Sequence, residues 1–392
     1  MMKKVLILGA GYGGLLSALT LRKYMTAEEA AITVVNRYPT HQIMTELHRL
    51  AADTISEQAI ALPLHRLLQG KQVDICVDTV LSIQPDNNQV ELESGTTYVY
   101  DVLVIALGSE TAFYGIPGLR ENSYTLKSIE DANRIRNHIK GRIEAYRNTK
   151  DTADMTIIVG GGGLTGVELV GELADMLPKW CSSMGVNPQD VRLYNIESSP
   201  TILQGFEAGL VTRAQTSLKK RGVHFINGAP VIEVQGNKVL LKDGQSMQAN
   251  TLVWTGGVQG SEIVANCGIK VERGRAIVNS YLQSTSNAAI FVVGDSAIID
   301  DEKGRPYPPS AQLAWQMGET VGYNMFAYLN NDSMQMFKPT ISGKIASLGR
   351  KDAIASVGAS GIPFTGLPAS LIKEASKMRY LAHIRALFAY VH

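Results

Sequence analysis

The chain has 392 residues, 45% of them hydrophobic and 19% charged, which suits two or three globular domains and excludes a disordered protein. Lys and Arg number 37 against 36 acidic residues, and this near-neutral charge argues against a nucleic-acid-binding protein, which needs a basic excess. Cys76, Cys181 and Cys267 lie far apart without a C-x-x-C motif, so a disulfide scaffold, a thiol–disulfide active site and a cysteine-rich metal site are excluded.

The N-terminus predicts a strand, a glycine-rich turn and a helix in immediate succession. An apolar run over 5–8 precedes the turn GAGYGG at 9–14, and leucines follow with helical spacing at 15, 16, 19 and 21. In this dinucleotide-binding pattern Gly9 permits the tight turn, Gly11 lets the backbone approach a pyrophosphate, and Gly14 lets helix and strand pack closely. The helix N-terminus then offers unpaired N–H groups to the phosphates.

The next strand, over 32–35, ends in Asn36 and Arg37, where the general pattern has a ribose-binding acid. The amide of Asn36 can still hydrogen-bond a ribose hydroxyl. Arg37 is placed to reach a phosphate or to cover an adenine ring. We therefore retain this strand end as a nucleotide-binding position.

The strand–turn–helix pattern returns at 156–177, where Gly161, Gly163 and Gly166 take the three glycine positions. Each copy continues into a predicted β-meander and a closing strand that ends in glycine, at Gly108 and at Gly257. One such motif is weak evidence, since glycine-rich loops occur in unrelated α/β proteins. Two copies in one chain favour two dinucleotide-binding units.

In the second copy the strand over 192–196 ends in Glu197, later than the pattern predicts. We attribute the delay to an inserted loop over 178–190. Glu197 would accept hydrogen bonds from both ribose hydroxyls and repel a 2′-phosphate, which favours NADH over NADPH. The alternative is a solvated strand end.

A buried strand over 289–293 runs into Asp295, and Ser310 is a suitable N-cap for a helix over 311–329. An aspartate after a buried strand can hold a ribityl hydroxyl. A helix N-terminus aimed at a flavin would stabilise the anion that forms on reduction. These features predict that the first unit holds a flavin and that the second delivers a nicotinamide.

The segment 366–392 predicts one or two amphipathic helices. Apolar side chains recur with helical spacing at Leu371, Ala375, Met378, Leu381, Ile384 and Phe388. A basic complement is supplied by Lys373, Lys377, Arg379, His383 and Arg385. Such a helix lies in the plane of an anionic membrane surface, although docking on the protein's own core or on a second subunit fits the composition equally well. No apolar run in the chain reaches the ~18 residues of a membrane-spanning helix.

Over almost its whole length the chain resembles the flavoproteins with two dinucleotide-binding domains, and among them the type II NADH:quinone oxidoreductases. Besides the glycine turns, the resemblance rests on TELH at 45–48, YDVLVIALGS at 100–109, VGGGGLTGVELVGEL at 159–173, WTGGV at 254–258, FVVGD at 291–295 and, most specifically, AQLAWQ at 311–316. It implies a respiratory-chain enzyme that pumps no protons. In a ping-pong reaction, NADH would reduce tightly, non-covalently bound FAD, and two electrons would then pass to a membrane quinone, menaquinone or ubiquinone.

The resemblance also implies site residues. FAD would contact Gly9, Ala10, Gly11, Tyr12, Gly13, Gly14, Asn36, Arg37, Thr45, Val80, Gly108, Asp295, Ala311 and Gln312. Within this set Val80 would touch the adenine, Asp295 the ribityl chain and Ala311 the flavin ring. NADH would contact Gly161, Gly163, Gly166, Glu197 and Gly257. No metal is expected.

Four residues are implied in catalysis. Glu168 resembles the family's glutamate between nicotinamide and flavin, although an acid early in a helix can also simply compensate the helix dipole. Gln312 and Gln316, four residues apart, would both point at the quinone head, whereas glutamines taken without the family are more often surface residues. Lys373 resembles a lysine near the quinone.

We therefore predict an α/β protein with two Rossmann-like domains and a C-terminal amphipathic helical anchor. The FAD domain would comprise 1–112 and 275–330, the NADH domain 113–274, and the membrane and dimer region 331–392. A quinone substrate favours a homodimer attached monotopically to the cytoplasmic face of the cell membrane. A ferredoxin- or rubredoxin-type reductase, a sulfide:quinone reductase and a FAD- and NAD-binding sensor without turnover are the alternatives.

Overall fold

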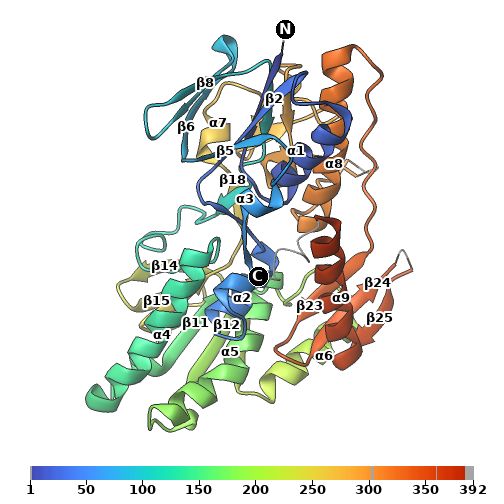
Figure 1. The fold of residues 1–392 in the computed structure, drawn as a ribbon. Helices are drawn as coiled ribbons and strands as arrows, with labels where there is room; N and C mark the ends of the chain where they lie inside the picture. The colour runs from blue at the N-terminus through green and yellow to red at the C-terminus, as the bar shows by residue number, and fades with distance from the viewer. Residues whose placement is uncertain (1, 302–303, 359, 385–392) are drawn as a thin grey trace.

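The computed structural model describes residues 2–301, 304–358 and 360–384 (Figure 1). A five-stranded sheet forms the core of the first half, and all its strands run parallel. Its strands in spatial order are β21 (Ile290–Val292), β9 (Val102–Ile105), β1 (Lys3–Leu8), β2 (Ala30–Asn36) and β5 (Val73–Val77). A late segment of the chain thus completes the sheet that the N-terminus begins.

The second half contains a parallel four-stranded sheet with the same internal order. Its strands are β17 (Thr251–Trp254), β11 (Thr156–Gly160), β12 (Arg192–Glu197) and β13 (Val223–Asn227). These correspond in order to β9, β1, β2 and β5 of the first sheet, so the repeat in the sequence is also a repeat in space. The α/β class predicted from the sequence is confirmed.

Each half also carries the predicted antiparallel meander. The first consists of β6 (Val80–Gln84), β7 (Gln89–Leu92) and β8 (Thr97–Val99), and the second of β14 (Val231–Gln235), β15 (Lys238–Leu241) and β16 (Ser246–Gln248). Just beyond Gly108 and Gly257, β10 (Ser109–Thr111) pairs antiparallel with β18 (Val258–Gly260). This short ladder ties the two halves together.

Helices cover the sheets in Figure 1. The longer ones are α1 (Tyr12–Tyr24), α4 (Ile129–Thr149), α5 (Leu164–Ser183), α6 (Ala208–Lys219) and α8 (Ala311–Asn330). Short helices are α2 (Leu47–Ala51), α3 (Leu64–Leu67) and α7 (Glu262–Ala265). The remaining paired strands are β3 (Thr40–Gln42) with β4 (Ala61–Pro63), and β19 (Val271–Glu272), β20 (Arg275–Ile277) and β22 (Ala297–Ile298).

The loop predicted over 178–190 is wrong for its first six residues, because α5 continues through Pro178 to Ser183. A proline inside a helix removes one backbone hydrogen bond and usually ends or bends the helix. Here the apolar face of α5 continues beyond it, since Trp180 and Cys181 are 6% and 0% exposed. The burial of these two side chains outweighs the lost hydrogen bond.

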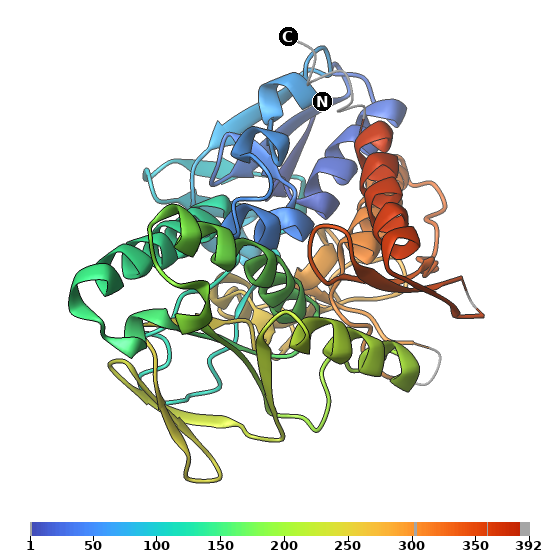
Figure 2. The same cartoon turned by 90° about the horizontal axis from the view of Figure 1, so that it is seen from below.

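The C-terminal region forms a small antiparallel sheet followed by a helix. Its elements are β23 (Gly343–Ser347), β24 (Ala353–Val357), β25 (Ile362–Thr365) and α9 (Leu367–His383). The helix lies along this sheet, and its C-terminal end contacts α8 through His383 (Figures 1 and 2). Arg385 and Phe388 of the predicted amphipathic segment lie outside the described residues.

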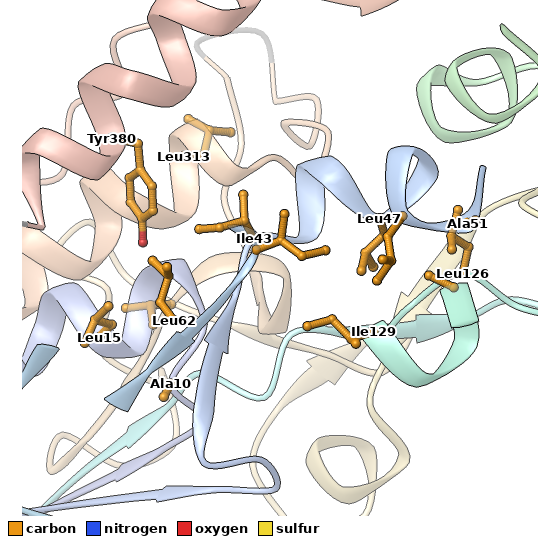
Figure 3. Close-up of a cluster of buried hydrophobic side chains, with 14 of the residues drawn as sticks. Ala10, Leu15, Ile43, Leu47, Ala51, Leu62, Leu126, Ile129, Leu313 and Tyr380 are labelled. Carbon is orange, nitrogen blue, oxygen red and sulfur yellow. The ribbon is translucent and has the colours of Figure 1, made fainter. Parts of the chain in front are cut away.

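The last helix is anchored in the main hydrophobic core. Tyr380, Leu381 and Ile384 are each at most 5% exposed. In Figure 3 the Tyr380 ring stands near apolar side chains of the N-terminal half and of α8, in the cluster that also holds Ile43, Ile129 and Leu313. Within the described ranges, no helix has both the length and the apolarity for a membrane crossing.

Candidate active site

The first glycine turn has the shape of a phosphate cradle. Gly9 has φ +97°, and a side chain there would collide with the carbonyl of Ala106. A Cβ on Gly14 would overlap the carbonyl oxygen of Gly9, whereas a Cβ on Gly11 would meet no protein atom within 4 Å. The helix that follows has no side-chain N-cap. Packing therefore requires the first and third glycines, while the second faces open space beside free N–H groups, which fits a pyrophosphate.

The second glycine turn repeats this geometry. Gly161 has φ +105°, and a Cβ on Gly166 would overlap the carbonyl oxygen of Gly161. A Cβ on Gly163 would again meet nothing within 4 Å, and α5 begins without a side-chain cap. The chain therefore presents two separate dinucleotide cradles.

Asn36 and Glu197 occupy the same place in the two halves. Asn36 Oδ1 accepts a hydrogen bond from the Ala10 N–H at 2.8 Å, and Glu197 Oε2 accepts one from the Gly162 N–H at 2.5 Å. Each side chain thus holds the residue between the first two glycines of its turn. Sequence spacing alone placed Glu197 late, but the hydrogen bond makes the equivalence clear.

Glu197 is the charged member of this pair. Burial alone would raise the pKa of Glu197, but hydrogen bonds from the Ser199 and Gly162 N–H groups outweigh it and lower the pKa. The carboxylate therefore stays ionised at neutral pH beside the second cradle. An anion at this position disfavours a 2′-phosphate.

The predicted ribityl-binding residue Asp295 follows β21 and is held by residues that the sequence analysis did not single out. Asp295 Oδ2 accepts from Ser109 Oγ at 2.8 Å, and Lys127 Nζ donates to the same hydroxyl at 3.0 Å. Burial lowers the pKa of Lys127, although Asp295 and other carboxylates raise it in part. No spacing rule links Lys127 to Ser109 or Asp295, so only the tertiary structure reveals that the three residues form one chain of hydrogen bonds.

Other predicted FAD contacts lie around the first cradle. Thr45 Oγ1 lies 3.2 Å from the Tyr12 hydroxyl. The side chain of Val80 is 5% exposed at the start of β6, and Arg37 is exposed just after β2. Ala311 is the first residue of α8, whose N-cap Ser310 accepts from the Leu313 N–H at 3.3 Å.

Glu168 and Lys373, assigned by resemblance to the nicotinamide and quinone sides, are in direct contact. Lys373 Nζ lies 2.5 Å from Glu168 Oε1, and the two side chains are 15% and 12% exposed. The Ser347 N–H also donates to Glu168 Oε1, at 3.0 Å. Residues on α5 and α9 thus form one half-buried ion pair.

His48, within TELH but not predicted as a site residue, completes this cluster. Its Nε2 lies 3.3 Å from Lys373 Nζ, and its Nδ1 lies 3.6 Å from Glu168 Oε2. Burial lowers the pKa of His48 well below its usual value, and the Lys373 and Arg49 charges lower it further. Neutral His48 therefore accepts a hydrogen bond from the Lys373 ammonium.

Two residues of the basic complement predicted for the last helix, Lys373 and Lys377, are half-buried, whereas Arg379 and His383 are exposed. Lys377 pairs with Glu374 and Glu46, and Arg49 joins the same two carboxylates from α2. On the other side of the helix, His383 Nε2 lies 2.7 Å from Glu319 Oε1, and the Arg379 guanidinium stacks over Trp315. Carboxylates and aromatic rings of neighbouring helices attract these cations, so they fasten α9 to the protein.

One exposed stripe of that helix is apolar. Leu367, Leu371 and Met378 are 56%, 60% and 46% exposed, and Ala375 is exposed between them. Their spacing places them on one stripe of the helix. The segment therefore presents an exposed apolar stripe, while Lys373 and Lys377 are turned toward carboxylates of the protein.

His41 connects the last helix to the first glycine turn. His41 Nδ1 lies 2.7 Å from the Ala10 carbonyl oxygen, and Nε2 lies 2.9 Å from the Tyr380 hydroxyl. Because a carbonyl can only accept, Nδ1 carries the hydrogen and Nε2 accepts from Tyr380. Burial lowers the pKa of His41 to about 4, although the hydrogen bond with Ala10 raises it in part.

We expect this histidine to make the fold sensitive to acid. The unfolded chain binds a proton on His41 near pH 6.5, but the folded chain does so only near pH 4, so stability falls as the pH drops through that window. The loss amounts to about 3 kcal/mol. Chemical denaturation at several pH values gives the free energy of unfolding as a function of pH. In His41→Asn its fall between pH 6.5 and pH 4 should be smaller by that amount. An unchanged profile would contradict the assignment.

Gln312 and Gln316 share one face of α8, as predicted, but their amides hold another part of the chain. Gln312 Nε2 donates to the Thr340 carbonyl oxygen at 2.9 Å and to Ser342 Oγ at 3.0 Å. Gln316 Nε2 donates to the same carbonyl oxygen at 2.9 Å, and its Oε1 accepts from the Thr340 N–H at 2.8 Å. The 340–342 segment therefore occupies the two side-chain amides that the AQLAWQ motif would direct at a quinone.

Comparison with known proteins identifies the family. A family model described as pyridine nucleotide-disulphide oxidoreductase matches residues 3–318. The type II NADH:quinone oxidoreductase of Staphylococcus aureus (strain NCTC 8325 / PS 47) is 35% identical over 392 residues, covering 98% of this chain and 95% of that protein. The enzyme of the same name from Staphylococcus epidermidis is 35% identical over 384 residues, covering 95% and 93%.

Solved structures agree on the fold. NDH2 from Plasmodium falciparum in complex with NADH superimposes with a TM-score of 0.87 at 15% identity, covering 97% of this chain and 95% of that one. The sulfide:quinone oxidoreductase of Aquifex aeolicus gives 0.81 at 24% identity, covering 98% and 92%. From the near full-length match at 35% identity, the chain belongs to the type II NADH:quinone oxidoreductases within the pyridine nucleotide-disulphide oxidoreductase family.

Proposed function

We propose that the protein is an NADH:quinone oxidoreductase that holds FAD on the first cradle and binds NADH at the second. The contact between Glu168 and Lys373 carries this proposal, because it joins the end of the second cradle to the C-terminal helix in one buried cluster. The names of the relatives support the choice of quinone as acceptor. The mechanism is ping-pong.

The first cradle has the groups that FAD requires. The open space at Gly11 and the free start of α1 would take the pyrophosphate, and Asn36 the adenosine ribose. Ser109 fixes the Asp295 carboxylate, whose other oxygen would accept from a ribityl hydroxyl. When bound, FAD supplies the chemistry of accepting a hydride and giving up two electrons.

The second cradle would orient NADH toward that flavin. The open space at Gly163 would take the pyrophosphate, and the ionised Glu197 would accept from the ribose hydroxyls and repel a 2′-phosphate. Gly257 lies at the carboxyl edge of the neighbouring strand β17. Glu168, one helical turn into α5, would face the nicotinamide.

Reduction of a quinone also takes up two protons. The Lys373 ammonium would hold a proton at Nζ, kept in place by Glu168 and by the lone pair of neutral His48. Gln312 and Gln316 would border the quinone once their hydrogen bonds to the 340–342 segment are exchanged. These roles combine proton supply with positioning.

Steady-state assays test the function directly. Protein purified with FAD should consume NADH only when a short-chain quinone is present, and NADPH should be a poor substitute.

The sulfide:quinone alternative is disfavoured, because Cys181 and Cys267 are buried and burial raises the pKa of Cys181 to about 11. Turnover with a ferredoxin but not with quinone would favour the other reductases. FAD-loaded protein that turns over with neither acceptor would favour the sensor.

Gln316 offers a test of the acceptor side. Changing Gln316 to Trp should slow reoxidation by quinone about tenfold or more, because the indole fills the α8 face and breaks both hydrogen bonds to Thr340. Reduction by NADH should be unaffected. Rapid mixing separates the two half-reactions, and Gln189→Trp in an exposed turn is the matched control. Equal loss in both half-reactions would refute the assignment.

We further propose that the apolar stripe on α9 lies on the cytoplasmic face of the cell membrane in a homodimer. Four exposed apolar side chains, Leu367, Leu371, Met378 and Ile362 on the adjoining strand, support a peripheral attachment. Leu371→Glu should release the protein from anionic vesicles in a sedimentation assay. Unchanged vesicle binding with a loss of dimer in solution would instead assign the stripe to the second subunit.

A further inference from the structure

Tyr114 is held in a conformation that tyrosine rarely adopts. Its φ is +54°, its side chain is 66% exposed, and its hydroxyl donates to the Gly256 carbonyl oxygen at 3.2 Å. The Ala112 N–H donates to the Gly257 carbonyl oxygen at 3.0 Å, and β10 pairs with β18 just before and after these residues. An exposed aromatic ring is thus clamped in a strained backbone, which points to a role outside packing.

The order of strands in the second sheet shows where this ring lies. The carboxyl ends of β12, β11 and β17 carry, side by side, Glu197, the glycine turn and Gly256. Gly161 and Gly256 are in close contact, since a Cβ on Gly161 would lie 2.7 Å from Gly256 Cα. A dinucleotide with its ribose at Glu197 and its pyrophosphate on the turn would extend toward β17. Tyr114 therefore lies on the nicotinamide side.

Gly257 supports this view. It has φ +147°, and a Cβ there would overlap the Tyr114 hydroxyl. The glycine pair in WTGGV thus makes room for a phenol at the edge where the ligand is expected.

We propose that Tyr114 is a binding residue for the nicotinamide half of NADH. The ring would make the apolar contact with the nicotinamide riboside, and the hydroxyl would keep the Gly256 carbonyl oriented. Because its backbone is already fixed, the ring loses little freedom when the ligand binds. This inference rests on the function proposed above and adds a residue that none of the motifs contains.

Two ligands and one variant test the proposal. ADP-ribose contains the adenosine and both phosphates of NAD⁺ but no nicotinamide. Calorimetric titration of Tyr114→Gly, with FAD bound, should show NAD⁺ affinity three- to tenfold weaker and ADP-ribose affinity unchanged. Thermal stability should not fall, because glycine adopts φ +54° without strain. Tyr24→Ala, an exposed tyrosine at the end of α1, is the control.

The outcomes separate the two proposals. Equal weakening of both ligands, unchanged NAD⁺ affinity, or lowered stability with unchanged discrimination would each overturn the role of Tyr114. If that happens while the wild-type protein still turns over NADH and quinone, only this inference fails. If the wild-type protein binds neither ligand and is not reduced by NADH, the proposed function fails with it.

Discussion

Changing Gly163 to Ala is expected to leave the protein folded with FAD bound and to weaken NADH binding about ten- to a hundredfold. The added Cβ meets no protein atom within 4 Å, so the fold has no reason to change. It occupies instead the space through which the backbone approaches a pyrophosphate. Losing one or two charge-assisted hydrogen bonds to phosphate corresponds to about 1.5–3 kcal/mol. The measurements are the KM for NADH and the thermal melting curve.

The third glycine of the same turn provides the contrast. A Cβ on Gly166 would overlap the Gly161 carbonyl oxygen and lie 2.7 Å from Thr255 Oγ1. Gly166→Ala should therefore lower the melting temperature, whereas Gly163→Ala should not. If Gly163→Ala kept its KM, the second cradle would not be the NADH site.

Replacing Lys373 with Met is expected to destabilise the protein by about 3 kcal/mol, because it leaves the largely buried Glu168 carboxylate without its cationic partner. The variant should also reoxidise with quinone about a hundredfold more slowly, because a proton donor is lost. Reduction by NADH should change much less. Denaturant titration and rapid mixing measure these effects separately.

A double variant shows whether loss of the ion pair causes the loss of stability in Lys373→Met. Glu168→Gln combined with Lys373→Met removes both charges and should recover most of the lost stability. Lys351→Met, at an exposed position, should affect neither stability nor rate. A double variant as unstable as the single one would show that Lys373 acts through packing alone.

Local signals in the sequence were sufficient to predict the two strand–turn–helix units. The two glycine turns, the strands before them and the helices after them were predicted in place, because the third glycine of each turn is required by a contact within its own strand–turn–helix unit, as between Gly14 and Gly9. The N-cap at Ser310 was predicted for the same reason. The repeat then fixed the order of the two sheets.

Contacts between distant segments could not be predicted. His48 and Lys373 are far apart in the chain, and nothing in either neighbourhood signals that they meet. The sequence likewise left open which side of α9 docks on the protein, because a helical pattern shows which side chains share a face but not which face docks. Pro178 was misjudged because the buried Trp180 outweighed a local helix-breaking signal.

One bound flavin should serve both half-reactions, with NADH as donor and quinone as acceptor. Anaerobic stopped-flow mixing of the FAD-loaded protein with NADH, followed by a short-chain quinone, tests it most directly. We expect rapid bleaching of the flavin absorbance by NADH, slower bleaching by NADPH, and rapid recovery on adding quinone. Bleaching without recovery, or no bleaching of protein that contains FAD, would contradict it.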